Sequence, residues 1–229
     1  MSDRLTVALA QIAPVWLDRD RTLAKVLEHV ARAADGGAQL VAFGEAFVPG
    51  YPFWVEHTGG ARFEDERQKE FYAHYLEQGV EPAVHLAPLQ QLARERGIAV
   101  ALGCMERARD RGGHSLYCAF VWIDRDGTMA PAHRKLVPTH EERLVWAPGD
   151  GHGLRCHATG PFTAGGLVCW ENWMTLPRAA LHAEGEDLHV AQWPGNHRNT
   201  EDLTRFLARE GRSYVMSVCG LMRREHVPD

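Results

Sequence analysis

Short apolar runs alternate along the chain with stretches in which apolar residues recur at helical spacing. The apolar runs predict buried strands at 5–10, 39–43, 98–104, 116–123, 167–169, 188–193 and 214–219. The helical spacing is clearest at Leu23, Val26 and Val30. It predicts helices at 22–34, 64–78, 82–96, 176–183 and 203–211. Strands and helices alternate in both halves, which is typical of an α/β fold whose helices cover the faces of sheets.

The middle of the chain departs from this alternation. Asp126-Gly127 is a strong turn signal, and it predicts that the strand at 116–123 folds back onto residues 128–134 as an antiparallel hairpin. Lys135 directly follows the second strand of that hairpin. Residues 50–62 and 136–164 are rich in Gly and Pro and lack periodicity, so we predict loops there. No linker divides the chain, and we predict one domain over residues 1–229.

Composition and charge narrow the class of protein. The 229 residues are 45% hydrophobic and 24% charged, which is typical of a globular chain. The net charge of -5 offers no field that would recruit nucleic acid or an anionic membrane. We expect no signal peptide, and no window of the sequence approaches the ~20 apolar residues that span a bilayer. The odd number of cysteines, 5, predicts reduced thiols, and we expect a cytoplasmic protein.

Three residues at the ends of predicted strands are candidates for chemistry. Cys169 closes an apolar run just before a helix, where free amide groups favour a thiolate. Glu45 also follows a strand, and sites in such sheets gather at the carboxyl ends of strands. Taken singly, Cys169 fits a core residue, Glu45 a surface acid and Lys135 a solvated cation. The other cysteines lie within strand runs or a loop and receive no role: Cys104, Cys118, Cys156 and Cys219.

Taken with their flanks, the three residues lie in recognisable motifs. The segments GEAFVPGYP (44–52), HRKLVPTHEERLVW (133–146) and GGLVCWENWM (165–174) resemble the nitrilase, or carbon–nitrogen hydrolase, superfamily. Trp170 directly after Cys169, and the GYP after Glu45, resemble its nitrilase branch. The resemblance covers nearly the whole chain and implies a four-layer αββα sandwich. By the same resemblance, we expect the chain to lack the last C-terminal strands of the family.

The resemblance also implies a mechanism and a set of alternatives. Glu45, Lys135 and Cys169 match the family's catalytic triad, and Glu142 matches a second glutamate that positions Lys135 or the substrate. Cys169 would attack a nitrile carbon, Glu45 would carry protons, and Lys135 would stabilise developing charge and keep Glu45 ionised. The products would be a carboxylic acid and ammonia, and no cofactor is implied. The alternatives are an amidase or cyanide-degrading relative, and a shortened subunit that is non-catalytic or depends on assembly.

Loop aromatics and histidines complete the expected site. Aromatic walls suit an organic nitrile, and the predicted substrate-binding residues are Tyr51, Trp54, Trp170, Trp193 and His197. The 13 histidines show no metal-ligand spacing, so we predict no metal site. The expected partners are a nitrile and water, together with further copies of the chain in a homo-oligomer.

Overall fold

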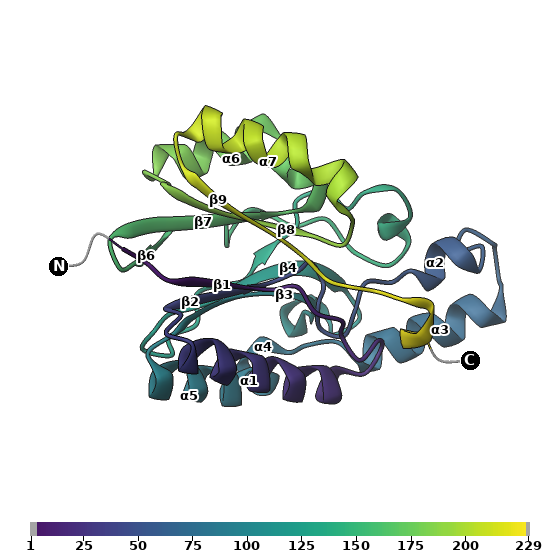
Figure 1. The fold of residues 1–229 in the computed structure, drawn as a ribbon. Helices are drawn as coiled ribbons and strands as arrows, with labels where there is room; N and C mark the ends of the chain where they lie inside the picture. Colours follow the sequence, from purple (N-terminus) through teal and green to yellow (C-terminus); the bar gives the residue numbers. More distant parts are fainter. Residues whose placement is uncertain (1–3, 228–229) are drawn as a thin grey trace.

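Two β-sheets face each other between two layers of helices in the computed structural model, which describes residues 4–227 (Figure 1). The first sheet has the order β1-β2-β3-β4-β5, and its strands are β1 (Val7–Ala10), β2 (Leu40–Phe43), β3 (Ala99–Arg107), β4 (Leu116–Ile123) and β5 (His133–Arg134). The second has the order β6-β7-β8-β9, with β6 (His157–Thr159), β7 (Phe162–Val168), β8 (Leu188–Trp193) and β9 (Tyr214–Cys219). The predicted αββα sandwich is confirmed.

Each sheet is parallel in part and antiparallel in part. Strands β1, β2 and β3 pair in parallel, and so do β7, β8 and β9. The pairs β3–β4, β4–β5 and β6–β7 are antiparallel. Because the carboxyl ends of β2 and β7 both lead into the space between the sheets, residues that follow these strands can meet there.

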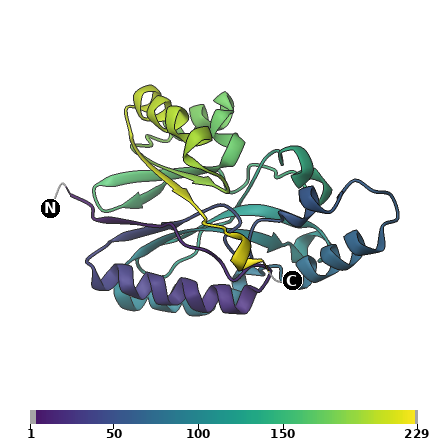
Figure 2. The same ribbon diagram turned by 45° about the vertical axis from the view of Figure 1, so that its right-hand side comes forward.

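The helices form the outer layers. Figures 1 and 2 show α1 (Arg19–Asp35) and α5 (Ala87–Arg96) over the first sheet, and α6 (Thr175–Ala183) and α7 (His197–Gly211) over the second. The short α2 (Trp54–His57) and α3 (Glu66–Glu77) extend beyond one end of the sheets. The remaining helical elements are α4 (Pro82–His85), η1 (Arg109–Arg111), η2 (His140–Leu144), η3 (Cys169–Trp173) and η4 (Arg224–His226).

The sandwich explains why its strands read as continuous apolar runs. In β2, Leu40 and Ala42 belong to the core between the sheets, whereas Val41 and Phe43 pack in the cluster that contains Val26 of α1. Both faces of the first sheet are therefore covered, and all eight residues of β4 are buried. A strand that is buried on both faces needs apolar residues at every position rather than at alternate ones.

Several predictions differ from the structure. The predicted loop at 50–62 contains α2, and the one at 136–164 contains η2, β6 and the start of β7. The helix predicted at 82–96 is divided between α4 and α5, because Pro88 has no N–H to continue the hydrogen-bond ladder. The second hairpin strand is reduced to β5 and an isolated bridge between Ile123 and Met129. Cys169 was placed at the end of a strand, but β7 ends at Val168 and Cys169 begins η3.

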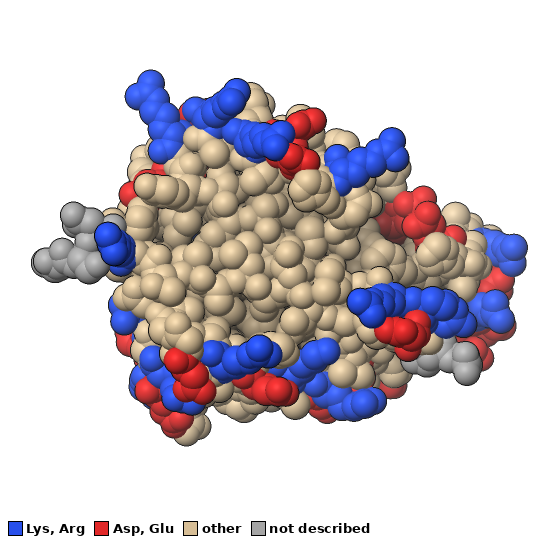
Figure 3. Space-filling model, viewed as in Figure 1, with Lys and Arg blue, Asp and Glu red and all other residues tan. Residues whose placement is uncertain are grey.

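The edges of the two sheets meet on one side of the molecule. After β9 the chain runs beside the segment after β1, where the Leu221 N–H donates to the Ile12 carbonyl at 2.9 Å. Seen from this side, charged side chains gather over the helical layers, and the middle of the face carries few of them (Figure 3). In residues 4–227 no helix is both long and apolar enough to cross a membrane.

Candidate active site

Glu45 is placed between the sheets by a close crossing of the backbone. A Cβ atom on Gly103 of β3 would overlap the Gly44 carbonyl oxygen, so only glycine lets the chain after β2 pass this close to β3. The Glu45 N–H then donates to the carbonyl of Trp193, at the end of β8 in the second sheet, at 3.3 Å. The Glu45 side chain is therefore buried in the space between the two sheets.

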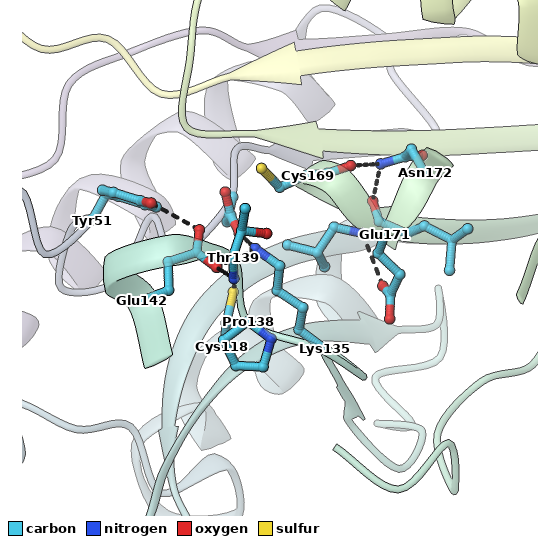
Figure 4. Close-up of polar contacts among 12 residues, drawn as sticks. Tyr51, Cys118, Lys135, Pro138, Thr139, Glu142, Cys169, Glu171 and Asn172 are labelled. Atoms are coloured by element: carbon cyan, nitrogen blue, oxygen red, sulfur yellow. Dashed lines mark hydrogen bonds and ion pairs between the residues drawn. The ribbon is translucent and has the colours of Figure 1, made fainter. Parts of the chain in front are cut away.

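Lys135 extends the pairing of β5 with β4 and directs its ammonium group at two carboxylates. Its N–H donates to the Cys118 carbonyl at 2.8 Å. Its Nζ donates to Glu45 Oε1 at 2.7 Å and to Glu142 Oε2 at 2.7 Å (Figure 4). The three side chains are almost completely buried, so these charges are stabilised by one another rather than by water.

Glu142 accepts hydrogen bonds from two other residues besides Lys135. It lies in the first turn of η2, where its Oε2 also accepts the Thr139 N–H at 2.6 Å. Its Oε1 accepts the Tyr51 hydroxyl at 2.8 Å, and Figure 4 shows Tyr51 on the far side of Glu142 from Lys135. Both carboxylate oxygens are therefore occupied. This geometry favours the predicted role of Glu142 in positioning Lys135.

Cys169 approaches the same point from the second sheet. It begins η3 with φ of 53°, a left-handed conformation that non-glycine residues rarely adopt. The Asn172 Nδ2 holds this turn by donating to the Cys169 carbonyl at 2.9 Å and to the Leu167 carbonyl at 3.2 Å. The Cys169 Sγ and carboxylate oxygens of Glu45 and Glu142 lie within 4.8 Å of one another. The structure thus brings the predicted nucleophile, base, lysine and second glutamate together.

Burial has a strong effect on the protonation of Glu45. It raises the pKa of Glu45 to about 7, and the negative charge of Glu142 acts in the same direction. The Lys135 ammonium lowers the pKa of Glu45, but by less than burial raises it. Lys135 therefore favours the ionised form of Glu45, as predicted, but it does not offset the whole effect of burial. A carboxylate with this pKa suits a group that must both accept and donate a proton near neutral pH.

The pKa values of Lys135 and Cys169 are also shifted. Burial by itself would lower the pKa of Lys135, but its acidic neighbours, Glu45 first among them, hold it well above its usual value. Burial raises the pKa of the Cys169 thiol, and the charge of Glu45 adds to this effect. Lys135 and the backbone N–H of Trp170 oppose the rise without cancelling it. The expectation of a thiolate at a helix N-terminus is thus wrong, because burial outweighs the effect of the Trp170 N–H at the start of η3. Cys169 rests as a thiol whose proton must leave during the reaction.

Glu45, Glu142 and Cys169 are also close enough to share a metal ion. The Lys135 ammonium, however, donates to both carboxylates and lies where a cation bound to them would sit. The donor set therefore fits a lysine-centred charge cluster better than a metal site.

A narrow cavity leads to Glu45. Its walls include Tyr51, Phe53, Leu221 and Met222, and the last three also line an open cleft of about 800 Å³. Leu221 and Met222 were not predicted. They lie in no motif, and the pairing of the chain after β9 with the segment after β1 places them here.

Of the five predicted substrate-binding residues, Tyr51 lines this cavity. Trp54 stacks on Phe71 at 5.3 Å within the core, and the Trp193 indole donates to the Ser217 hydroxyl at 2.8 Å. Trp170 is 54% exposed, and His197 lies on the surface of α7. The Trp193 carbonyl accepts the Glu45 N–H, but none of these four residues lines this cavity, and their binding roles stay predictions.

Comparison with known proteins identifies the class that this fold and site define. Residues 6–219 match the family model described as carbon–nitrogen hydrolase. The chain belongs to this family. An amidase from Nesterenkonia sp. AN1 has the same fold, with a TM-score of 0.71 at 19% identity over 95% of this chain and 78% of the amidase.

Curated relatives place the chain in the nitrilase branch of the family. It is 36% identical over 219 residues to nitrilase 2 of an unknown prokaryotic organism, covering 95% of this chain and 68% of that protein. It is 31% identical to nitrilase 1 of Arabidopsis thaliana, covering 100% and 65%, and 35% identical to an aliphatic nitrilase of Rhodococcus rhodochrous, covering 92% and 58%. The chain therefore spans about three fifths to two thirds of the length of these relatives.

Proposed function

We propose that the protein is a nitrilase that hydrolyses an organic nitrile to a carboxylic acid and ammonia. The observation that carries the proposal is the position of the Cys169 thiol within 4.8 Å of the Glu45 carboxylate, which itself accepts a hydrogen bond from Lys135. Relatives named as nitrilases, at 31–36% identity, support a nitrile rather than an amide as the substrate.

In the first step, Cys169 Sγ forms a bond to the nitrile carbon. The thiol proton passes to Glu45 and from there to the nitrile nitrogen, which yields a neutral thioimidate. Glu45 suits this transfer because its pKa is raised to about 7 by burial, so it releases a proton as readily as it accepts one. Lys135 places its positive charge where negative charge develops on the nitrogen.

Water completes the reaction in two further steps. Glu45 takes a proton from the first water as the water oxygen bonds to the thioimidate carbon, and it passes this proton to the nitrogen. The hydroxyl proton of the resulting tetrahedral species then moves through Glu45 to the nitrogen, the carbon–nitrogen bond breaks, and ammonia leaves behind a thioester. A second water, activated in the same way, adds to the thioester carbon and releases the acid and the Cys169 thiol. Expulsion of the thiol rather than ammonia from the first tetrahedral species would give an amide instead.

The proposal is tested by ammonia release from a panel of aryl, arylalkyl and aliphatic nitriles with hydrogen cyanide. We expect turnover of at least one organic nitrile with the acid as the main product, and loss of activity in Cys169→Ala. Cys156→Ala, a matched change at a half-buried thiol outside the site, should keep the activity. Amide as the dominant product from every nitrile, or turnover of amides alone, would contradict the proposal.

We also propose that the protein self-associates. Several large apolar side chains are exposed on η3 and the helices that follow, namely Trp170, Trp173, Leu176 and Phe206. Trp170 and Trp173 stack on each other at 5.9 Å, and exposed apolar groups of this size favour contact between protein surfaces. Light scattering at micromolar concentration should give a mass above that of one 25.6 kDa chain, and an active monomer would contradict this.

A further inference from the structure

Glu171 is a buried acid beside the site whose side chain the mechanism above does not use. It lies two residues after Cys169 and is 1% exposed. Its carboxylate accepts three hydrogen bonds. Oε1 accepts the Leu136 N–H at 2.9 Å, and Oε2 accepts the Val168 N–H at 3.1 Å and bonds to His133 Nε2 at 3.0 Å.

The three donors come from the two chain segments that carry the nucleophile and the lysine. Val168 directly precedes Cys169 in the second sheet, whereas Leu136 directly follows Lys135 in the first. His133 lies two residues before Lys135, so Glu171 is bonded to the chain both before and after Lys135. In the view of Figure 4, Glu171 and Lys135 both lie below Cys169.

This link matters because the thiol itself is not tied to the charge cluster. Within the described residues, no side-chain hydrogen bond joins Cys169 to Glu45, Lys135 or Glu142, and the two sheets pack through an apolar core. Apolar packing is not directional, whereas hydrogen bonds to a carboxylate fix both distance and angle. Besides the hydrogen bond from the Glu45 N–H to the Trp193 carbonyl, the Glu171 carboxylate supplies such a directional link, and it does so next to the Cys169 turn.

We propose that Glu171 is a positioning residue that sets the distance between the Cys169 sulfur and the Lys135–Glu45 pair. The proposal rests on the proposed function for its kinetic consequence. An acid is required because only an ionised carboxylate accepts all three hydrogen bonds. A glutamine amide would turn its NH₂ group toward at least one of the donors.

The first test is Glu171→Gln in the full chain. A displacement near 1 Å from near-attack geometry costs about 10²-fold in rate, so we expect kcat to fall by that factor with KM within about threefold. Glu106→Gln is the matched control. It removes a carboxylate that binds Arg134, the residue next to Lys135, at 2.7 and 2.8 Å, and it should lower thermal stability with kcat within about twofold of wild type.

A second pair of variants keeps the proposal testable if Glu171→Gln does not fold. His133→Gln retains an N–H donor for Glu171, whereas His133→Leu removes it. We expect kcat to be close to wild type in the first and about tenfold lower in the second. Equal kcat values in the two variants, or a Glu171→Gln enzyme that loses stability but keeps kcat, would overturn the positioning role.

The rate of Cys169 alkylation by iodoacetamide separates this proposal from the proposed function. The rate depends on transfer of the thiol proton to Glu45, not on any nitrile. We expect it to fall about tenfold in Glu171→Gln and to be unchanged in Glu106→Gln. If wild type hydrolyses no nitrile, the proposed function fails, and unequal alkylation still supports the positioning role. Equal alkylation in both variants would count against it.

Discussion

The two sheets contribute to the site in different ways. The first sheet and its following loop supply Glu45, Lys135 and Glu142, which are joined to one another by hydrogen bonds of 2.7 Å. The second sheet supplies Cys169, which is held through its backbone by Asn172 and, in our proposal, through Glu171. One side of the site is therefore a linked charge cluster, and the other is a single thiol on a left-handed turn.

The contrast matches what each side must do. Charged groups that stabilise a transition state work best when they are already oriented, because no reorganisation is then needed during the reaction. A nucleophile, in contrast, must exchange its proton for a bond to carbon. Burial and the charge of Glu45 raise the pKa of Cys169, so this side of the site rests in its neutral form.

Loss of the central cation should have the largest effect on the first-sheet cluster. Lys135→Met should lower kcat by about 10³-fold, because the developing negative charge loses its stabilising group. It should also lower the free energy of unfolding by about 3 kcal/mol at pH 8, where two buried carboxylates lose their partner, and by less at pH 5, where Glu45 can protonate. Urea denaturation at the two pH values measures this.

Lys69→Met is the control for that variant. Lys69 pairs with Glu64 and Glu66 on the surface, so kcat should not change. If Lys135→Met retained more than a tenth of wild-type kcat, the cluster would not act as a preorganised electrostatic unit.

Loss of the Glu142 charge should lower kcat by less than loss of Lys135, and it should shift the pH profile in a defined direction. The negative charge of Glu142 raises the pKa of Glu45, so Glu142→Gln should lower that pKa. In wild type, kcat/KM should rise with pH through about 7, as Glu45 loses its proton. In the variant, this rise of kcat/KM should move to lower pH by roughly one unit. The value of kcat should be about tenfold lower, because Lys135 is less firmly held.

Glu141→Gln, an exposed neighbour in η2, is the matched control and should leave the profile unchanged. A shift of the limb to higher pH in Glu142→Gln would mean that Glu142 acts on Glu45 mainly through Lys135 rather than by its own charge.

The smallest effect is expected for the outermost hydrogen bond of the cluster. Tyr51→Phe keeps the ring packed against Trp146 and removes the hydroxyl that donates to Glu142, so kcat should fall roughly three- to tenfold with KM unchanged. Tyr214→Phe on the exposed face of β9 is the control. A rise in KM with unchanged kcat would instead show that the Tyr51 hydroxyl binds substrate.

The sequence predicted the two sides of the site unequally. The motifs around Glu45, Lys135 and Cys169 predicted which residues meet, because each follows a recognisable strand and the resemblance supplied their order. The protonation of Cys169 could not be predicted, since it depends on burial between sheets that lie far apart in sequence. Leu221 and Met222 reach the cavity through one backbone pairing with the segment after β1, for which no local pattern exists. The role proposed for Glu171 likewise depends on two partners far away in the sequence, Leu136 at a separation of 35 residues and His133 at 38.

The most direct test of the account is to find the covalent intermediate. Wild-type protein mixed with a nitrile that it hydrolyses should be quenched in acid during steady turnover and measured by intact mass and peptide mapping. We expect a thioimidate or acyl adduct on the peptide that contains Cys169, and none on the peptides that contain Cys104, Cys118, Cys156 or Cys219. An adduct on another cysteine, or ammonia release that continues in Cys169→Ala, would contradict the division of the site between a first-sheet charge cluster and a second-sheet nucleophile.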